Sequence, residues 1–355
     1  MSRPLSILYV AYPLLAVTDE SAGGAEQMLL AVEREMACTG HRTTVAAAHG
    51  SRVCGMLLPT GPPASAPDQY ETRECMHTSC ILDYVRRKPH EFDLIHDKSG
   101  SFFRHAAQCP VPVLATLHLP RSFYSPCCFE APPANLYFNC VSNSQARSFA
   151  DLPNFVGVVQ NGIAVERFAF SRDKDDYVLW LGRICEEKAP HLAIAAAQRA
   201  GMPLVIAGQV YPFSYHQNYF GRELRPHLNG SSRVRFVDTP LASQKLGLLR
   251  HARALLLTST VEETSSLVAM EAMACGTPVV AFRRGAFPEI VSDGETGFLV
   301  DSVEEMAAAL SQVACILAES CRERVERHFS ASRMGRDYEG LYRRVLDRTS
   351  RPIAA

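Results

Sequence analysis

Two carboxylates eight residues apart, Glu263 and Glu271, are the strongest chemical signal in this chain. An apolar run at 254–257 precedes them, and a Gly-Thr-Pro turn at 276–278 follows. This order predicts a strand, a polar turn that carries Glu263, and a helix that carries Glu271. Eight residues of helix would span roughly 12 Å at about 1.5 Å per residue. That is about the length of a diphosphate with a sugar on each end.

The turn between the two acids should present the start of that helix. Its first backbone N–H groups, near Ser265, Ser266 and Leu267, have no partner within the helix. Such an end carries partial positive charge and favours a phosphate. One acid could therefore hold one sugar, the helix end the phosphates, and the other acid the second sugar. The alternative is a pair of solvated glutamates, which the strand–turn–helix setting disfavours.

Two cations follow an earlier apolar run, at 178–181. Gly182 and Arg183 come directly after that predicted strand, and Lys188 lies five residues beyond Arg183. Arg183 would offer a bidentate fork and Lys188 a point charge to a diphosphate. Held there, the two cations would stabilise the charge that grows on a leaving nucleoside diphosphate, without a metal. Taken alone, the pattern also fits ordinary surface charges.

These segments together resemble the signature of the retaining nucleotide-sugar glycosyltransferases of family four, the glycosyl transferase group 1, which have the GT-B fold. The match is close over residues 271–279. The family usually has Glu-Gly-Phe-Gly or Glu-Pro-Phe-Gly in the turn, where this chain has Glu-Thr-Ser-Ser at 263–266. The family also has Lys-Gly where this chain has Lys188 followed by Ala189.

The resemblance implies an α/β protein of two doubly wound Rossmann-like domains that face a central cleft. It implies a retaining, metal-independent transfer of a hexosyl group from a nucleoside-diphosphate sugar to an acceptor hydroxyl, in carbohydrate biosynthesis. Glu263 would contact the donor sugar and Glu271 the nucleotide ribose. The leaving phosphate would accept the acceptor's proton during front-face attack. No cofactor is expected, and a UDP-sugar is favoured over a GDP-sugar as donor.

Four further residues are candidates in the first half. Gly23 and Gly24 open a predicted helix, and glycines there would let the backbone approach a ligand; the resemblance places them beside the donor phosphates and the acceptor. His118 ends the predicted strand 113–117, where the resemblance places a catalytic histidine near the transferred sugar. His96 ends the strand 94–96 and could line the acceptor side. A flexible helix start and structural histidines remain the alternatives.

The chain alternates short apolar runs with helical patterns, which predicts parallel sheets covered by helices. We expect a first, acceptor-side domain over residues 1–165, a nucleotide-sugar domain over 166–330, and a helix over 331–355 that crosses back to the first domain. The charged segment 164–176 is the expected linker. Predicted strands are 7–11, 44–48, 94–96, 113–117, 138–141, 156–159, 178–181, 204–207, 234–237, 254–257 and 279–282; predicted helices are 25–38, 189–200, 241–251, 267–275, 303–318 and 331–349.

Composition narrows the classes of partner. The net charge is −1 and neither half is basic, so nucleic acid is not expected as a partner, nor is strong membrane association. The apolar stretch 5–17 is interpreted as a buried strand and loop rather than a signal peptide. We expect a cytoplasmic protein whose twelve cysteines are reduced and mostly buried. Asp173 and Asp175 match an Asp-x-Asp metal motif but lie in the expected linker, so no essential metal is predicted.

Two other functions remain open at this point. An epimerase or a phosphorylase could use the same scaffold with a nucleotide sugar. A catalytically silent sugar-nucleotide-binding protein is the second alternative, and the Ser/Thr-rich turn at 264–266 is compatible with it. Release of nucleoside diphosphate with and without an acceptor separates these alternatives from a transferase.

Overall fold

The chain divides into two units, in a computed structural model that describes residues 3–19, 21, 23–64, 66–228 and 233–350. Unit 1 comprises residues 1–162 and 331–355, and unit 2 comprises 163–330. The first boundary lies after Gly162, whereas the predicted first domain ended at residue 165. The second boundary lies after Ser330, and the predicted second domain also ended at residue 330. Residues 351–355 of the predicted last segment lie outside the described residues. The segment 164–176, predicted as a linker, is part of unit 2, and Lys174 Nζ donates to the Arg250 carbonyl oxygen at 2.8 Å.

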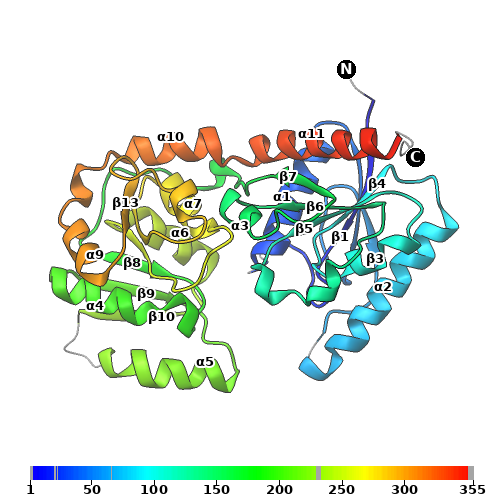
Figure 1. Cartoon of the computed structure of the whole chain (residues 1–355). Helices are drawn as coiled ribbons and strands as arrows, with labels where there is room; N and C mark the ends of the chain where they lie inside the picture. The colour runs from blue at the N-terminus through cyan, green and yellow to red at the C-terminus, as the bar shows by residue number, and fades with distance from the viewer. Residues whose placement is uncertain (1–2, 20, 22, 65, 229–232, 351–355) are drawn as a thin grey trace. The chain divides into compact units, whose positions relative to one another are not determined.

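Unit 1 is built on a parallel sheet with the strand order β3-β2-β1-β4-β5-β6-β7 (Figure 1). Every residue of β1, β4, β5 and β6 is buried, which explains their nearly continuous apolar sequence. The strands are β1 (Ser6–Val10), β2 (Arg42–Ala47), β3 (Met56–Pro59), β4 (Leu94–Asp97), β5 (Val113–Leu117), β6 (Leu136–Cys140) and β7 (Phe155–Val158). The α-helices of this unit are α1 (Gly24–Cys38), α2 (Tyr70–Arg87), α3 (Asn143–Arg147) and α11 (Ala331–Ser350).

Unit 2 repeats the same plan, with the parallel strand order β10-β9-β8-β11-β12-β13. One core joins the sheet to α6, α7 and α10, and a second joins its other face to α4 and α9. The strands are β8 (Val178–Leu181), β9 (Leu204–Gly208), β10 (Val234–Asp238), β11 (Leu255–Leu257), β12 (Val279–Phe282) and β13 (Gly297–Val300). The helices are α4 (Pro190–Ala200), α5 (Ser214–Tyr219), α6 (Ala242–His251), α7 (Leu267–Ala274), α8 (Phe287–Ile290), α9 (Val303–Leu310) and α10 (Ala318–His328).

The predicted class, two doubly wound α/β domains, is confirmed, and so are most of the predicted strands. The predicted helix 303–318 is wrong, because α9 ends at Leu310 and α10 begins only at Ala318. The apolar run 306–317 has no Gly or Pro to mark that break. The short strands β3 and β13 and the helices α2, α3, α5, α8 and α10 were not predicted.

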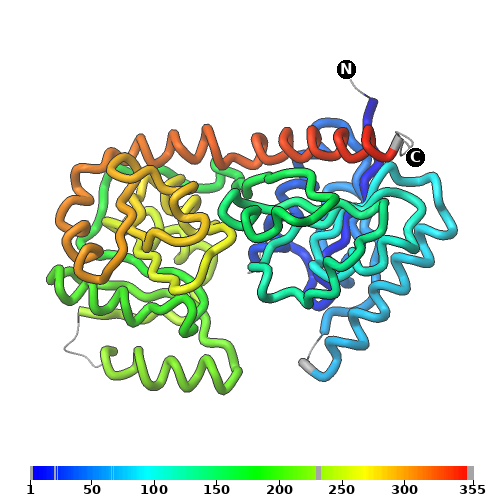
Figure 2. The backbone as a smooth tube through the Cα atoms, in the orientation of Figure 1, coloured from blue at the N-terminus to red at the C-terminus, as the bar shows by residue number. Residues whose placement is uncertain are grey.

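Helix α11 returns to unit 1 and packs beside α1 (Figure 2). Tyr338 and Tyr342 on its buried face are fully enclosed. His96 is also fully buried, with hydrogen bonds of 2.7 Å to the Tyr342 hydroxyl and 2.7 Å to the Thr116 hydroxyl. The prediction that His96 could line the acceptor side is therefore wrong, because both of its nitrogens are used inside unit 1.

None of the described helices is both long and apolar enough to cross a membrane. The twelve cysteines form no disulfide bond. Only five of them are buried, at positions 109, 140, 185, 275 and 321, so the prediction that most are buried is wrong.

Candidate functional site

The carboxyl ends of β8 and β11 lie side by side in the middle of the unit 2 sheet. The strand order runs backwards from β10 to β8 and then forwards from β11, so the order reverses between these two strands. Ligands of doubly wound sheets bind outside the carboxyl ends of strands at such a reversal. Gly182, Arg183 and Lys188 follow β8, and Glu263 follows β11. The topology thus brings the two predicted segments to one edge of the sheet.

Lys188 and Glu263 form an ion pair, which joins two residues that were predicted separately. Their side chains are 28% and 12% exposed, so the pair is shielded from water but still reachable. The Ser259 hydroxyl donates to the same Glu263 oxygen, Oε1. Arg183 and Lys188, the two cations predicted to bind the diphosphate, are called the clamp from here on. Because Lys188 of the clamp and Glu263, the predicted sugar-binding acid, share one contact, their contributions to binding are coupled.

The buried hydroxyl of Thr258 holds the turn that carries Lys188. This hydroxyl accepts a hydrogen bond from the Trp180 indole N–H at 3.0 Å and donates one to the Ala189 carbonyl oxygen at 2.8 Å. Ala189 has φ 47° and ψ 52°, the left-handed region, and is fully buried. An L-residue pays a steric cost there that glycine does not.

Replacement of Ala189 by glycine is expected to stabilise unit 2. The left-handed conformation costs ~1–2 kcal/mol for an L-residue, and the added freedom of glycine in the unfolded chain offsets part of the gain. Ala189→Gly should raise the free energy of unfolding by ~0.5–1 kcal/mol, measured by urea denaturation. Ala196→Gly within α4 is the control and should lower it by about 1 kcal/mol. A destabilised Ala189→Gly protein would contradict the assignment of strain.

The backbone at Glu263 rests on the loop after β12. Gly285 has φ 54°, and a β-carbon there would collide with the backbone N and O of Glu263. The Ala286 N–H donates to the Glu263 carbonyl oxygen at 2.8 Å, and the Gly285 N–H donates to the Glu262 carboxylate at 2.6 Å. This contact requires glycine at 285 and fixes the position from which the Glu263 side chain projects.

Helix α7 begins after the turn, at Leu267, with Ser266 as its N-cap. The Ser266 hydroxyl accepts from the Ala269 N–H at 3.4 Å, which satisfies one of the orphan donors at this end. Ser265 and Leu267 are half-buried beside it. Only residues 267–271 of the span between the two glutamates are helical, so the estimate of 12 Å, which assumed helix throughout, is wrong.

Glu271 is more deeply buried than a solvated glutamate on a helix surface, with 5% of its side chain exposed. It is the one charged residue of α7, an otherwise apolar helix. Lys245 Nζ, from α6, donates to Oε1 at 2.7 Å and lies 2.6 Å from Oε2. The Lys245 side chain is 30% exposed and so can move into water. Glu271 is therefore a buried, singly paired acid whose cation can be displaced.

Arg183 is exposed, and its guanidinium belongs to none of the ion pairs found in the described part of unit 2. Gly182 lies half-buried before it, close to the Trp180 ring. Lys188 already forms an ion pair with Glu263. Of the two predicted phosphate-binding cations, Arg183 can therefore bind an anion without breaking an existing ion pair.

Gly23 and Gly24 belong to unit 1, where Gly23 is the N-cap of α1 and Gly24 its first residue. A β-carbon on Gly23 would collide with the Glu26 carboxylate, which lies over this glycine and is 6% exposed. The absence of a side chain at 23 thus makes room for an acid of the protein itself. An anionic ligand at this helix end would have to displace Glu26.

His118 directly follows β5 in unit 1, and the Tyr124 hydroxyl lies 3.1 Å from its backbone N–H. Burial lowers the pKa of the His118 imidazole to about 3, and the nearby charge of Lys98 adds to this shift. His118 is therefore neutral near pH 7. It can exchange hydrogen bonds with a sugar hydroxyl but cannot act as a general acid there.

Unit 1 is expected to lose stability in mild acid. Burial also lowers the pKa of His77, to about 4, and that of His96 to well below 6.5. Unfolded histidines bind a proton near pH 6.5, so the unfolded chain takes up more protons than the folded chain below that pH. The melting temperature should be constant above about pH 6.5 and fall as the pH is lowered toward 4. His118→Gln should reduce this slope, and an unchanged slope would contradict the assignment.

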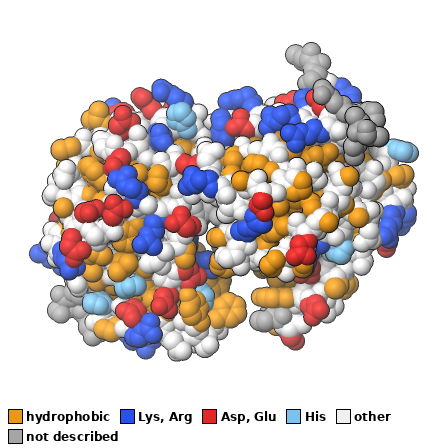
Figure 3. Space-filling view, in the orientation of Figure 1, with side chains coloured by type: hydrophobic (Ala, Val, Ile, Leu, Met, Phe, Trp, Pro, Cys, Tyr) orange, Lys and Arg blue, Asp and Glu red, His pale blue; other side chains and the backbone are white. Residues whose placement is uncertain are grey.

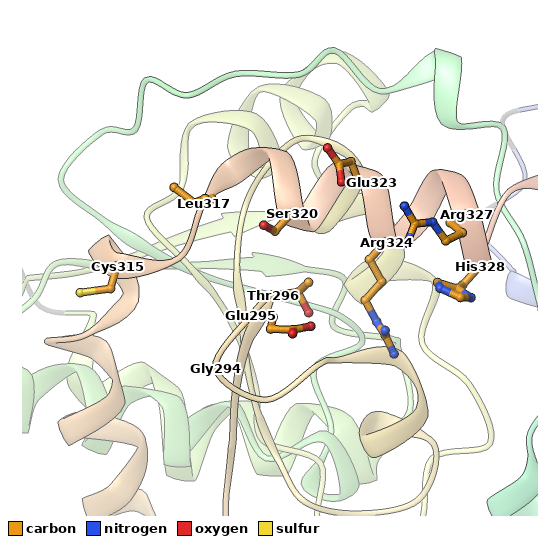
Figure 4. A pocket seen from close by; sticks show the side chains of 10 residues that line it. All are labelled: Gly294, Glu295, Thr296, Cys315, Leu317, Ser320, Glu323, Arg324, Arg327 and His328. Atoms are coloured by element: carbon orange, nitrogen blue, oxygen red, sulfur yellow. The ribbon is translucent and has the colours of Figure 1, made fainter.

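A cavity of about 520 Å³ lies elsewhere on unit 2, between α10 and the loop before β13 (Figure 4). No predicted site residue lines it. Arg324 projects into it, but its guanidinium donates to the carbonyl oxygens of Glu289 and Ile290, so this cation serves the fold. Among the described residues, no group of three His, Cys, Asp or Glu side chains is placed to hold a metal, and this includes Asp173 and Asp175.

Sequence reasoning did not identify Lys245, Ser259 or Gly285, which support the two glutamates. Ser259 directly follows β11, and polar residues at strand ends were a usable signal for it. Lys245 lies 26 positions from Glu271 in a different helix, and no local pattern links the two.

Comparison with known proteins supports a relation to sugar transferases. Residues 164–327 match the family described as Glycosyl transferases group 1. The chain is 27% identical over 285 residues to a D-inositol 3-phosphate glycosyltransferase from Corynebacterium efficiens, which covers 66% of each protein. The alignments with the next three such relatives span about a third of their lengths, 34%, 31% and 33%.

The fold agrees with solved structures over nearly the whole chain. Sucrose-phosphate synthase from Thermosynechococcus elongatus has a TM-score of 0.78 at 21% identity, with 97% of this chain and 99% of that one covered. HepE from Anabaena, solved with UDP and glucose, has a TM-score of 0.72 at 16% identity, with 96% and 100% covered. These likenesses establish the GT-B fold. The match over residues 164–327 shows that unit 2 carries a domain of the group 1 glycosyl transferases.

Proposed function

We propose that this protein is a retaining glycosyltransferase that moves a hexosyl group from a UDP-sugar to an acceptor hydroxyl without a metal. The observation that carries the proposal is the Lys188–Glu263 ion pair at the reversal of strand order, beside the start of α7. A cation and a helix N-terminus bind phosphate groups, and a carboxylate accepts hydrogen bonds from sugar hydroxyls.

In the proposed reaction, the bond between the anomeric carbon and the β-phosphate oxygen breaks. The acceptor oxygen forms the new bond on the same face, and its proton passes to the departing phosphate. Arg183, Lys188 and the first N–H groups of α7 stabilise the negative charge that grows on that phosphate. Glu263 binds hydroxyls of the sugar, and Glu271 binds those of the ribose. No protein carboxylate forms a covalent intermediate.

The donor and acceptor classes also form part of the proposal. A UDP-sugar is chosen because a solved relative in fold, HepE, holds UDP. D-inositol 3-phosphate is the first acceptor to try, because relatives of this chain are named for it. Thermal shifts should rise more with UDP than with GDP, since a ligand that binds only the folded state stabilises it.

The decisive experiment measures UDP release from UDP-glucose with and without D-inositol 3-phosphate, in the presence of excess EDTA. We expect release that depends on the acceptor and survives chelation, with the product's anomeric configuration equal to the donor's by NMR. A silent binding protein would release no UDP, and an epimerase would convert the sugar while keeping the diphosphate bond. Loss of activity with EDTA and rescue by manganese or magnesium would overturn the metal-independent mechanism.

A further inference from the structure

Four aromatic side chains gather on unit 2 after the carboxyl end of β9. Tyr211, Phe213, Tyr215 and His216 form this aromatic shelf, with His216 at its centre. Ring centroids lie 5.7 Å from His216 to Tyr211, 5.9 Å to Phe213 and 5.0 Å to Tyr215. Tyr211 and Phe213 stack at 6.4 Å with an angle of 20° between their planes.

The shelf is fixed to the segment that carries the clamp cations. His216 is buried, and its Nδ1 lies 2.8 Å from the Ile184 carbonyl oxygen. A carbonyl only accepts, so Nδ1 carries the proton and donates it to this bond. The Tyr215 hydroxyl donates to the Glu187 carboxylate, one residue before Lys188. These two bonds hold the aromatic rings beside the candidate donor site.

The segment that anchors the shelf also contacts the loop of Glu263. The Glu187 carbonyl oxygen accepts from the Thr260 N–H at 2.9 Å, and Thr260 precedes Glu263 by three positions. The aromatic shelf, the clamp segment and the sugar-binding loop are therefore linked by hydrogen bonds within unit 2.

The outer rings of the shelf face water. Phe213 is 49% exposed and Tyr215 is 46% exposed, although both are large apolar side chains. Figure 3 shows hydrophobic side chains exposed over this end of unit 2, near α5. Rings that are fixed in position but uncovered lose little conformational entropy when a flat ligand stacks on them.

We propose that the aromatic shelf, in addition to the predicted acceptor side of unit 1, binds a pyranose ring of the acceptor, so that a saccharide or a glycoside serves as acceptor as well as D-inositol 3-phosphate. This inference rests on the proposed function, because it assigns the shelf to the same reaction. A β-glucopyranoside has equatorial hydroxyls and axial C–H groups, so both of its faces are apolar and its rim is polar. Phe213 would stack on such a face, while the Tyr215 hydroxyl and the Glu187 carboxylate would meet hydroxyls at the rim.

The chemistry of the surroundings favours a sugar over a lipid. A lipid chain requires a continuous aliphatic surface, whereas Glu187 and the tyrosine hydroxyl stand among these rings. A nucleobase can also stack on aromatic rings. In that case the shelf would contribute to the binding of UDP alone, and this difference separates the two ligands by experiment.

Saturation-transfer NMR with methyl β-D-glucopyranoside tests the proposal on the full chain without donor, with glycerol as a polyol that lacks a ring. We expect the axial protons on one face of the probe to receive the most saturation. Phe213→Ala should weaken binding about fivefold, the loss typical of one stacked ring. Phe213→Leu keeps the apolar bulk without the flat face and should bind as weakly. Tyr215→Phe keeps the ring but loses the hydroxyl at the rim, so it should weaken binding less than Phe213→Ala does.

Leu317→Ala is the matched control, because Leu317 is 65% exposed and lies on unit 2 outside the shelf. Thermal unfolding of each variant reports whether it is folded. Wild-type probe binding by both Phe213 variants would overturn the proposal. So would weaker UDP binding by calorimetry with unchanged glucoside binding, which would assign the shelf to the base. Sugar transfer without glucoside binding would overturn the assignment of the shelf and leave the proposed function standing. Glucoside binding without UDP release from UDP-glucose, with either D-inositol 3-phosphate or the glucoside as acceptor, would overturn the proposed function and leave the shelf standing.

Discussion

Lys188→Ala is expected to lower turnover by about a hundredfold to a thousandfold, because one preorganised charge on a leaving phosphate contributes ~2–4 kcal/mol to transition-state stabilisation. The ion pair with Glu263 adds a second effect: without Lys188, the Glu263 carboxylate keeps only the Ser259 hydroxyl among its described partners. Both effects fall on kcat more than on folding, since the Lys188 side chain is partly exposed.

The double variant Lys188→Ala/Glu263→Ala separates these effects. Coupled residues are not additive, so its loss should be smaller than the two single losses combined. Arg183→Ala removes a clamp charge without breaking an ion pair and should act additively with Glu263→Ala. Lys88→Ala, an exposed lysine of unit 1, is the control for nonspecific charge loss. Near-wild-type turnover of Lys188→Ala would sink the assignment of the clamp.

Glu271→Ala is expected to weaken binding of both free UDP and the UDP-sugar, because it removes a charged acceptor for two ribose hydroxyls. Each hydrogen bond to a charged group contributes roughly 1.5–3 kcal/mol, so titration calorimetry should show a loss of at least tenfold. Glu263→Ala should leave UDP binding almost intact while lowering donor turnover. Glu271→Gln keeps the size of the side chain and removes only its charge.

Lys245 provides the control for this experiment. Glu271→Ala also frees the Lys245 ammonium, whose charge attracts a diphosphate and would mask part of the loss. The Lys245→Ala/Glu271→Ala pair removes that attraction and should bind UDP more weakly than Glu271→Ala alone. If Glu263→Ala abolishes UDP binding and Glu271→Ala does not, the orientation of the ligand is reversed.

The sequence was sufficient for most strands because parallel strands buried on both faces are apolar throughout, as in 113–117 and 178–181. It was insufficient where the end of a helix depends on contacts with other elements. At Leu310, for example, α9 ends although the apolar run continues. Strand β13 is only four residues long, Gly297–Val300, and carries no alternation that would reveal it.

The candidate site, like the fold, was predictable only where local sequence determines it. The residues at strand ends could be placed, because β8 and β11 bring Lys188 and Glu263 to one edge of the sheet. Their ion pair could not be predicted, because it joins positions 75 residues apart. The burial of Glu271 was likewise hidden, since the sequence of α7 shows an acid among apolar residues but not the lysine of α6 that neutralises it.

The boundaries of unit 2 have a consequence for biosynthesis. The Ile163 N–H donates to the Phe329 carbonyl oxygen at 2.8 Å, so the two ends of unit 2 are joined by a backbone hydrogen bond. Unit 2 is thus a closed insertion in unit 1, whose last helix, α11, is translated after it. On the ribosome, unit 2 can complete its own core while unit 1 still lacks the helix that buries Tyr9 and His96. Unit 1, although begun first, therefore reaches its folded state last.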